Sequence, residues 1–355
     1  MILPADPFSQ IPFIEVAMSP AVSAPVTPER ILQMAWGYAP PLVLEAAIRH
    51  HVFDVLDAGP KSLSELAQAT GASRRGLAAI CNLLVGLDFL RKTSDGAYML
   101  APESAAFLVS SKPGFQGGLI RHTSEQLLPN WLKLNGVVAS GRPVESVNQQ
   151  GPGSEFFTEF VNDILPMSYN VARELAAHLD LAAAGPVSVL DLAAGSGVWG
   201  IALAQASAQV KVTAVDWPAV IPVTRATVAR FGVVGQFSFS EGDLQDADFG
   251  SGHNVATLGH ILHSEGIDRS KALLNKTFAA LAPGGTIAIA EFLVNADRTG
   301  PVGGLIFAVN MLVNTDCGDT FSFEEISEWL TEAGFTDART IPTHGPSPLI
   351  LATKP

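Results

Sequence analysis

The sequence predicts a mixed α/β fold in which a parallel sheet, covered by helices on both faces, follows a mainly helical N-terminal region. From residue 187 onward, short β-rich runs alternate with helical stretches, as is typical of parallel strands joined by crossover helices. A glycine-rich turn at 193–200 lies between the first run and the helix after it. Residues 28–139 instead carry apolar side chains at the helical spacings of three and four. Because 355 residues exceed one typical core, the length favours two domains or one large one.

The composition indicates a globular protein and excludes two classes of partner. Hydrophobic residues make up 48% of the chain and charged residues 15%, which is not the balance of a disordered protein. The net charge of -13 argues against a general affinity for nucleic acid or for an anionic membrane surface, because both are bound through Lys and Arg. No uncharged apolar stretch reaches the roughly 18 residues that suggest a membrane span, so we predict no membrane association.

The cysteines and the N-terminus indicate where the protein works. Cys81 and Cys317 are the only cysteines, and they form neither a disulfide framework nor a C-x-x-C metal pair. The first 28 residues lack the basic start and unbroken apolar core of a signal peptide. A reducing, cytoplasmic location is therefore expected.

Residues 1–27 form a Pro- and Ala-rich arm ahead of the first domain. Phe8, Ile11, Phe13 and Ile14 suggest that part of this arm packs on another surface. An arm that packs on nothing is the alternative.

Residues 28–140 are predicted to form a winged-helix domain. The range Ser62–Glu65 matches a capping box at a helix start, Gly71 ends that helix, and Ser73 can cap the next one. The stretch F-L-R-K-T-S-D-G-A-Y-M-L then predicts a hairpin that turns at Asp95-Gly96. Three helices followed by a hairpin is the winged-helix order.

A winged helix raises the possibility of DNA binding. Residues 28–110 hold seven Lys or Arg against eight Asp or Glu, and the would-be recognition helix is apolar after Arg74 and Arg75. A dimerisation role is therefore favoured over DNA binding. A ligand-responsive DNA-binding regulator is kept as the alternative from another class.

Residues 141–185 are predicted to be a linker and a connecting helix, the latter from about Phe156 to His178, and residues 186–355 form the sheet domain. The predicted parallel strands are V-S-V-L-D, V-K-V-T-A-V-D, Q-F-S-F-S, N-V-A-T-L and T-I-A-I-A-E-F-L. The runs R-T-I-P and P-L-I-L-A-T predict a terminal strand pair.

The stretch V-L-D-L-A-A-G-S-G-V-W-G at 189–200 predicts a nucleotide-binding turn. Gly195 and Gly197 let a ligand approach the backbone, and the helix that follows offers free N–H groups. Asp216 ends the next strand, 19 residues after Gly197, where a carboxylate can accept hydrogen bonds from two ribose hydroxyls. A dinucleotide loop fits weakly and a P-loop is excluded, because no G-K-[ST] follows. A methyltransferase loop fits, with Asp191 ending the strand and the glycines after it.

From about residue 28 to its end, the chain resembles the S-adenosylmethionine-dependent small-molecule O-methyltransferases, which pair an N-terminal winged-helix dimerisation domain with a class I methyltransferase domain. The matching pieces are V-L-D-L-A-A-G-S-G, A-V-D-W-P, E-G-D-L, I-L-H-S-E, L-A-P-G-G-T-I-A-I-A-E and F-S-F-E-E-I-S-E-W-L-T-E-A-G-F. The resemblance implies a Rossmann-like seven-stranded sheet and a homodimer. It also implies S-adenosyl-L-methionine (SAM) as cofactor, S-adenosyl-L-homocysteine (SAH) as product, and methyl transfer to a hydroxyl of a small aromatic or polyketide-like acceptor.

The resemblance implies a role for particular residues at the cofactor. It makes Asp216 the ribose ligand, places Asp243 near the adenine amine with Leu244 packing on the ring, and places Ser168 near the methionine carboxylate. The family's usual first glycine is Ala193 here, so we expect weakened or shifted cofactor contacts. The full set of expected cofactor residues is Ser168, Asp191, Ala193, Gly195, Gly197, Asp216, Trp217, Gly242, Asp243 and Leu244.

The stretch G-H-I-L-H-S-E-G at 259–266 carries two histidines that three hypotheses can explain. They are metal ligands together with Glu265 and Asp243, solvated or capping residues, or part of a catalytic site. His263 follows the fourth strand of its domain, at the sheet edge where functional residues gather. The resemblance makes His263 the general base and Glu291 the acid that supports it. We predict no metal, and expect His260 to be a bystander or a minor cofactor contact.

The acceptor side departs from the family pattern. Ser264 and Glu265 stand where the family has Asp and Trp, and Ile164 stands where it has a methionine facing the reaction centre. Asn310 and Met311 lie in the segment that lines the acceptor pocket in relatives, although ordinary helix packing explains them equally well. The expected acceptor residues are Ile164, Ser264, Asn310 and Met311. The altered motif leaves C- or N-methylation open, and also a SAM-binding enzyme that transfers no methyl group.

Overall fold

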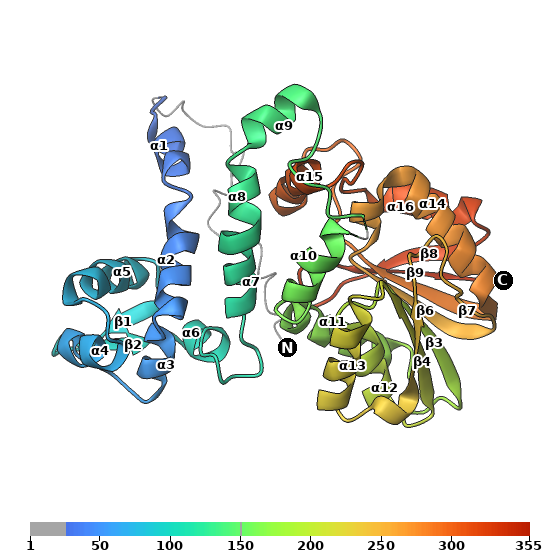
Figure 1. Ribbon diagram of the computed structural model, residues 1–355, viewed down its shortest axis with the longest axis horizontal. Helices are drawn as coiled ribbons and strands as arrows, with labels where there is room; N and C mark the ends of the chain where they lie inside the picture. Colours follow the sequence, from blue (N-terminus) through green and yellow to red (C-terminus); the bar gives the residue numbers. More distant parts are fainter. Residues whose placement is uncertain (1–25, 150) are drawn as a thin grey trace, which may run out of the picture. The chain divides into compact units, whose positions relative to one another are not determined.

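The computed structural model describes residues 26–149 and 151–355. The chain divides into two compact units at residues 128 and 129 (Figure 1). The predicted arm falls outside the described residues apart from Val26 and Thr27, and so do Phe8, Ile11, Phe13 and Ile14.

The N-terminal unit has the predicted order of helices followed by a hairpin. Ser62 accepts a hydrogen bond from the Glu65 N–H, and the Glu65 carboxylate accepts the Ser62 N–H at 2.7 Å, so the capping box is confirmed. Gly71 ends that helix at φ 70°, and Ser73 caps the next. The elements are α1 (Glu29–Ala35), α2 (Ala39–Arg49), α3 (Val52–Asp57), α4 (Leu63–Thr70), α5 (Arg74–Gly86), antiparallel β1 (Leu90–Lys92) and β2 (Tyr98–Leu100), α6 (Pro102–Phe107), α7 (Gly117–His122) and the π-helix η1 (Thr123–Leu127).

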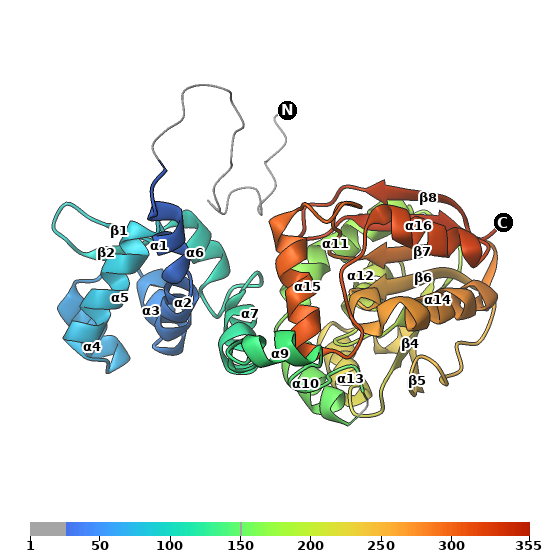
Figure 2. The same cartoon turned by 90° about the horizontal axis from the view of Figure 1, so that it is seen from above.

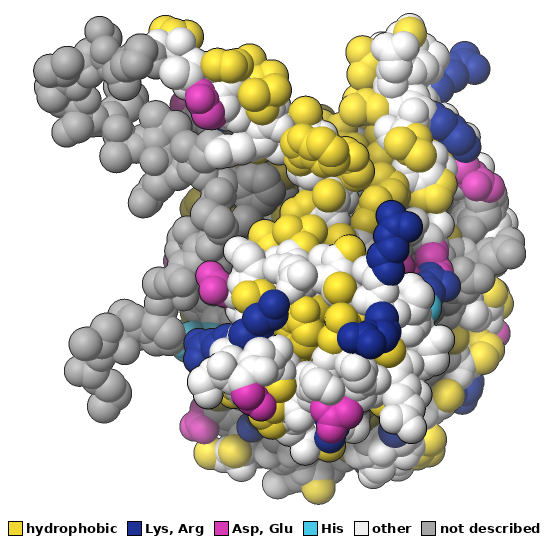
Figure 3. Space-filling view, turned by 90° about the vertical axis from the view of Figure 1, so that its left-hand side faces the viewer, with side chains coloured by type: hydrophobic (Ala, Val, Ile, Leu, Met, Phe, Trp, Pro, Cys, Tyr) yellow, Lys and Arg dark blue, Asp and Glu magenta, His cyan; other side chains and the backbone are white. Residues whose placement is uncertain are grey.

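Helix α1 contributes no buried residue to the core of this unit, although its sequence is apolar. The core is built from α2 to α5, the hairpin and the segment after α6, with Phe53, Leu66, Leu77 and Leu84 fully buried. Figure 3 looks onto this unit and shows hydrophobic side chains gathered over the upper part of the visible face. Exposed apolar surface of this kind marks an interaction site.

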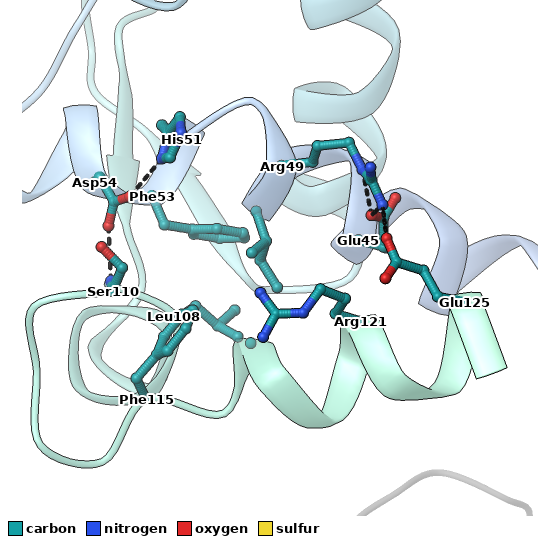
Figure 4. A pocket seen from close by; sticks show the side chains of 12 residues that line it. Glu45, Arg49, His51, Phe53, Asp54, Leu108, Ser110, Phe115, Arg121 and Glu125 are labelled. Atoms are coloured by element: carbon teal, nitrogen blue, oxygen red, sulfur yellow. Dashed lines mark hydrogen bonds and ion pairs between the residues drawn. The ribbon is translucent and has the colours of Figure 1, made fainter. Parts of the chain in front are cut away.

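A cavity of about 290 Å³ lies in the N-terminal unit between α2, α3, the loop after α6 and α7 (Figure 4). Arg49 bridges Glu45, one turn earlier on α2, and Glu125 of η1. Asp54 accepts hydrogen bonds from the Ser110 N–H and pairs with the His51 ring at 3.0 Å. These paired charges hold the last turn of α2 and the start of α3 against the segment from residue 108 to 125.

The C-terminal unit contains the predicted sheet, which confirms the α/β fold class. In the described part of the chain, seven strands form one sheet in the order β5-β4-β3-β6-β7-β9-β8. All neighbours from β5 to β7 are parallel, and β9 pairs antiparallel with both β7 and β8, as expected for the terminal pair. The strands are β3 (Val187–Leu192), β4 (Val210–Asp216), β5 (Phe237–Glu241), β6 (His253–Gly259), β7 (Leu281–Ala290), β8 (Thr336–Ile341) and β9 (Leu349–Thr353).

Helices cover both faces of this sheet (Figure 2). Alternate residues of each strand point to opposite faces, so Leu190 and Leu258 join α14 and α16, whereas Val189 and Val255 join α11 and α12. The helices are α8 (Leu128–Trp131), α9 (Leu134–Ser140), α10 (Pro152–Phe160), α11 (Leu165–His178), α12 (Val198–Ala206), α13 (Ile221–Arg230), the 3₁₀-helix η2 (Val234–Gln236), α14 (Leu262–Ala280), α15 (Val302–Asn314) and α16 (Phe323–Glu332). None of the helices in the described ranges is long and apolar enough to span a membrane.

The predicted continuous helix from Phe156 to His178 is wrong, because the structure breaks it into α10 and α11. Pro166 lies in the first turn of α11. A proline has no N–H to donate and its ring clashes with the carbonyl four residues earlier, here that of Asn162, so a helix does not continue through it. The helix therefore ends at Phe160 and restarts at Leu165.

The segment predicted as a linker is tied to the C-terminal unit. The Val144 and Val147 N–H groups donate to the Val313 and Asn314 carbonyls, each at 2.9 Å. The division between the two compact units falls at residue 128, earlier than the boundary at residue 140 that the sequence suggested.

Candidate active site

The glycine-rich turn between β3 and α12 runs through left-handed backbone. Ala193, Gly195 and Gly197 have φ values of 50°, 54° and 78°. Such values suit glycine and strain a residue that carries a Cβ atom. Ala193 therefore follows the glycine geometry of the family while bearing a methyl group, and Gly197 begins α12.

Asp191 holds this turn from inside the protein. Its Oδ2 accepts the Gly200 N–H at 2.9 Å and its Oδ1 accepts the Thr257 hydroxyl at 2.7 Å. The side chain is fully buried. Burial raises the pKa of Asp191 to about 7, against the lowering effect of these two hydrogen bonds. The carboxylate thus anchors α12 and β6 to β3, and direct contact with a cofactor stays a prediction.

We expect Asp191→Asn to remove a pH dependence of stability. Because the folded-state pKa is raised from 3.8 to about 7, the ionised form is disfavoured in the folded protein. Wild-type stability should therefore fall as the pH rises from 4 to 7, by up to about 4 kcal/mol at 1.36 kcal/mol per pKa unit. Urea unfolding at pH 5 and pH 7.5 measures this effect, with Asp180→Asn on the surface as the matched control. Equal slopes for wild type and Asp191→Asn would contradict the assignment.

Asp216 ends β4 beside the turn. Its Oδ2 accepts the Gly195 N–H and its Oδ1 accepts the Trp217 N–H, each at 2.7 Å. Burial raises the pKa of Asp216 to about 6. A carboxylate oxygen can accept more than one hydrogen bond, so each oxygen keeps capacity for a hydroxyl donor. This arrangement fits a pair of adjacent ribose hydroxyls.

Asp243, in the loop after β5, lies in a segment that is hydrogen bonded to Asp216 and Trp217. The Gly242 N–H donates to the Asp216 carbonyl at 3.0 Å, and Trp217 Nε1 donates to Asp243 Oδ2 at 3.2 Å. Leu244 is buried next to Asp243. The structure therefore brings Asp216, Trp217, Gly242, Asp243 and Leu244 together. That they bind a cofactor stays a prediction.

Ser168 and Ile164 lie at the start of α11. Ser168 is 4% exposed. A serine hydroxyl can both donate and accept a hydrogen bond, so it can serve a polar ligand atom. Together with the turn and the Asp216 carboxylate, it makes the donor and acceptor set of this site suitable for an amino-acid nucleoside such as SAM.

His263 and Glu291 form a buried pair at the carboxyl ends of the neighbouring strands β6 and β7. His263 Nδ1 lies 2.8 Å from Glu291 Oε2, and Glu291 Oε1 accepts the Leu262 N–H at 2.7 Å. Burial acts to raise the pKa of Glu291, but the charge and hydrogen bonds of His263 outweigh it and lower that pKa. Glu291 is thus an ionised carboxylate that fixes the imidazole and leaves Nε2 as the nitrogen able to take up a proton.

Two aromatic rings border this imidazole. Phe307 of α15 meets the His263 ring edge-on, with centroids 4.9 Å apart, and Phe292 lies 6.2 Å away. The His263 side chain is 11% exposed. The imidazole therefore faces a nearly dry, apolar surface.

His260 lies apart from this pair. Its Nε2 is 2.8 Å from the Ser347 hydroxyl and its ring packs on Phe292. Burial lowers the pKa of His260 to about 4, so the ring is neutral at neutral pH. In the described ranges, no group of three or more His, Cys, Asp or Glu side chains lies close enough together to hold a metal ion.

Ser264 and Glu265, the two residues after His263, each hydrogen-bond to a neighbouring group. The Ser264 hydroxyl donates to the Ile261 carbonyl at 3.0 Å, and Arg269 Nε donates to Glu265 Oε2 at 2.6 Å. Arg269 also reaches Asp243 Oδ1 at 3.1 Å. Sequence reasoning missed Arg269. Its spacing of four residues from Glu265 was a signal, although the helix is kinked at Gly266 between them.

Asn310 belongs to a hydrogen-bond network within the C-terminal unit. Its Oδ1 accepts Trp131 Nε1 at 2.9 Å and Asn314 Nδ2 at 3.1 Å, and Asn130 Nδ2 donates to Asn314. Met311 is buried beside it at 5% exposure. The network fixes α15 against α8, and contact of Asn310 or Met311 with an acceptor stays a prediction.

Comparison with known proteins places the chain in a family. The model of the O-methyltransferase domain matches residues 142–336, more than half of the chain. The model of the O-methyltransferase dimerisation domain matches residues 32–110.

Individual relatives span nearly the whole chain. The 3-hydroxy-5-methyl-1-naphthoate 3-O-methyltransferase of Streptomyces sahachiroi is 29% identical, over 88% of this chain and 91% of its own. The L-tyrosine C(3)-methyltransferase of Streptomyces lavendulae is 26% identical, over 94% of this chain and 95% of its own. The crystal structure of human N-acetylserotonin methyltransferase in complex with SAM is 25% identical, covers 94% of this chain and 99% of its own, and has a TM-score of 0.81. The chain is therefore a methyltransferase that belongs to the O-methyltransferase family, with its dimerisation domain preceding the catalytic one.

Proposed function

We propose that this protein transfers the methyl group of SAM to a hydroxyl of a small aromatic or polyketide-like molecule, with His263 as the general base. The buried His263–Glu291 pair carries this proposal, because the carboxylate 2.8 Å from Nδ1 orients the ring. The named activity of the Streptomyces sahachiroi relative on a hydroxynaphthoate supports the acceptor class.

The cofactor is SAM, which supplies an electrophilic methyl group when bound. Asp216 would hold its ribose, Asp243 its adenine amine, and Ser168 its amino-acid end. The left-handed turn at Gly195 and Gly197 leaves room for close approach to the backbone.

The protein's own part in the reaction is to deprotonate and orient the acceptor. A phenol with a pKa near 10 is ionised to only about one part in a thousand at pH 7. His263 Nε2 takes up the hydroxyl proton as the oxygen attacks, and Glu291 stabilises the imidazolium that forms. The rings of Phe292 and Phe307 exclude water from this proton transfer.

A panel of hydroxylated naphthoates, anthraquinones and simple phenols, incubated with methyl-labelled SAM, tests the proposal. We expect O-methylated product from at least one fused-ring phenol, and SAH binding in calorimetry. Methylation confined to amines, or no SAH binding, would overturn it.

C-methylation is the second candidate, and the relative named as an L-tyrosine C(3)-methyltransferase favours it. An ionised phenol can also be alkylated on a ring carbon beside the oxygen, so the same base would serve. Mass spectrometry and NMR of the product distinguish the two, because only a C-methylated product keeps its free hydroxyl.

The protein works as a homodimer in this proposal, and α1 carries the prediction. Ile31 is 73% exposed and Trp36 is 65% exposed. Ile31 directly precedes the range that the dimerisation-domain model matches, and Trp36 lies within it. Obligate interfaces resemble a core cut in half, so Ile31→Glu with Trp36→Glu should convert dimer to monomer in light scattering at micromolar concentration. Val234→Glu, at a 55% exposed position of the C-terminal unit, is the control. A wild-type monomer would refute the dimer.

A further inference from the structure

Arg269 joins two carboxylates that come from different ends of the candidate active site. Its Nε donates at 2.6 Å to Oε2 of Glu265, which lies two residues after His263 in the chain. Its Nη2 donates to Asp243 Oδ1 at 3.1 Å, in the loop after β5. One guanidinium therefore spans from the proposed base segment to the proposed adenine side.

The chemistry of this bridge requires arginine. The Glu265 side chain is 5% exposed, and a buried carboxylate needs a partner that is both charged and hydrogen bonded. A guanidinium offers several donors in a rigid planar fork, whereas a lysine ammonium is a single point charge. Glu265 fixes one side of the fork, which leaves the other side directed at Asp243.

The Asp243 carboxylate is consequently held by donors from three directions. Oδ2 accepts Trp217 Nε1 at 3.2 Å, and Oδ1 accepts both the Gln245 N–H at 3.0 Å and Arg269. Arg269 is the only charged group among these donors. Charge-assisted hydrogen bonds are the stronger kind, so Arg269 has the largest influence on how the carboxylate is oriented.

The loop that carries Asp243 is held independently of Arg269. Lys276 Nζ donates to the Leu244 and Gln245 carbonyls, each at 2.9 Å. Loss of the Arg269 side chain should therefore release the Asp243 carboxylate while the backbone keeps its path.

We propose that Arg269 is a positioning residue that sets selectivity for the adenine amine, by holding the Asp243 carboxylate where it accepts a hydrogen bond from that amine. This inference rests on the proposed function, since it assumes that SAM binds with its adenine beside Asp243. Glu265, which stands where the family has tryptophan, is the anchor that makes the bridge possible.

Calorimetry with two ligands tests the inference: SAH, and the analogue with hydrogen in place of the adenine amine. A hydrogen bond to a charged group changes affinity by about tenfold or more, so wild type should prefer SAH by that factor. Arg269→Met should reduce the preference to about threefold or less, with little change in affinity for the analogue. Because Arg269→Met leaves a buried charge on Glu265, the double variant Glu265→Gln with Arg269→Met is measured as well and should behave alike.

Arg49→Met is the matched control, because Arg49 also bridges a glutamate four residues earlier and a distant carboxylate, in the N-terminal unit. It should keep the wild-type preference. An unchanged preference in both Arg269 variants would overturn the inference and leave the proposed function intact. Equal wild-type affinities for the two ligands would overturn it as well, again without touching the cofactor assignment. No binding of either ligand to wild type would refute the proposed function, and the inference with it.

Discussion

His263→Ala should lower kcat by about 10²–10⁴-fold, the range that a positioned general base contributes. The variant loses the proposed base, while Asp216 and the glycine-rich turn are untouched. Binding of SAH should therefore stay within about twofold of wild type, since the removed group makes no contact in the proposed cofactor site. Single-turnover assays at saturating SAM, together with calorimetry, measure the two quantities.

The remaining activity of His263→Ala should respond to the acidity of the acceptor. Without a base, only the fraction of phenol already ionised reacts, so the rate should rise about tenfold per pH unit below the phenol pKa. A nitrophenol of low pKa should be rescued most. Glu291→Gln, which keeps the shape of the side chain and removes its charge, should show a smaller loss of activity. Undiminished transfer by His263→Ala would remove His263 as the base.

Asp216→Asn should weaken SAH binding by about 100-fold, the second large effect. Two hydrogen bonds from ribose hydroxyls to a carboxylate are expected, and bonds to a charged group contribute about 1.5–3 kcal/mol each. The Gly195 and Trp217 N–H groups lose their ionised acceptor at the same time. Calorimetry measures the change, with Asp180→Asn as the surface control.

The raised pKa of Asp216 predicts that cofactor binding depends on pH. The pKa of Asp216 is raised to about 6 by burial, and only the ionised carboxylate accepts from both hydroxyls. Wild-type affinity for SAH should therefore fall as the pH drops below 6, by at most tenfold per unit for one proton. Asp216→Asn should show no such fall. A flat wild-type profile from pH 7 to pH 5 would contradict the assignment.

Local sequence patterns predicted the elements that local interactions determine. The capping box at Ser62 and Glu65 forms within one helical turn, and the strand runs from β3 to β7 follow from periodicity alone. His263 was expected at the sheet edge because it follows a strand, whereas its pairing with Glu291 was implied by the family resemblance. In the structure the two side chains are hydrogen bonded at the ends of the neighbouring strands β6 and β7.

Some local signals were present in the sequence but were not used. Pro166 could have indicated the break between α10 and α11, because proline disfavours a helix that continues through it. Thr257 was a polar residue within the apolar run of β6, and it proved to be the partner of Asp191. A buried hydroxyl needs a hydrogen-bond partner, but the sequence does not say which one.

By itself the sequence determined most of the order of helices and strands, the glycine-rich turn and the place of His263 at a strand end, since these depend on residues close in the chain or on strand order. Only the tertiary structure decided what Asp191, Asn310 and Arg269 contact. The partners of Asp191 and Asn310 lie 66 and 179 residues away, at Thr257 and Trp131, and Asp243 lies 26 residues before Arg269. The packing of distant segments selects these contacts from many polar side chains that have the same local propensity. No periodicity in the sequence therefore predicts them.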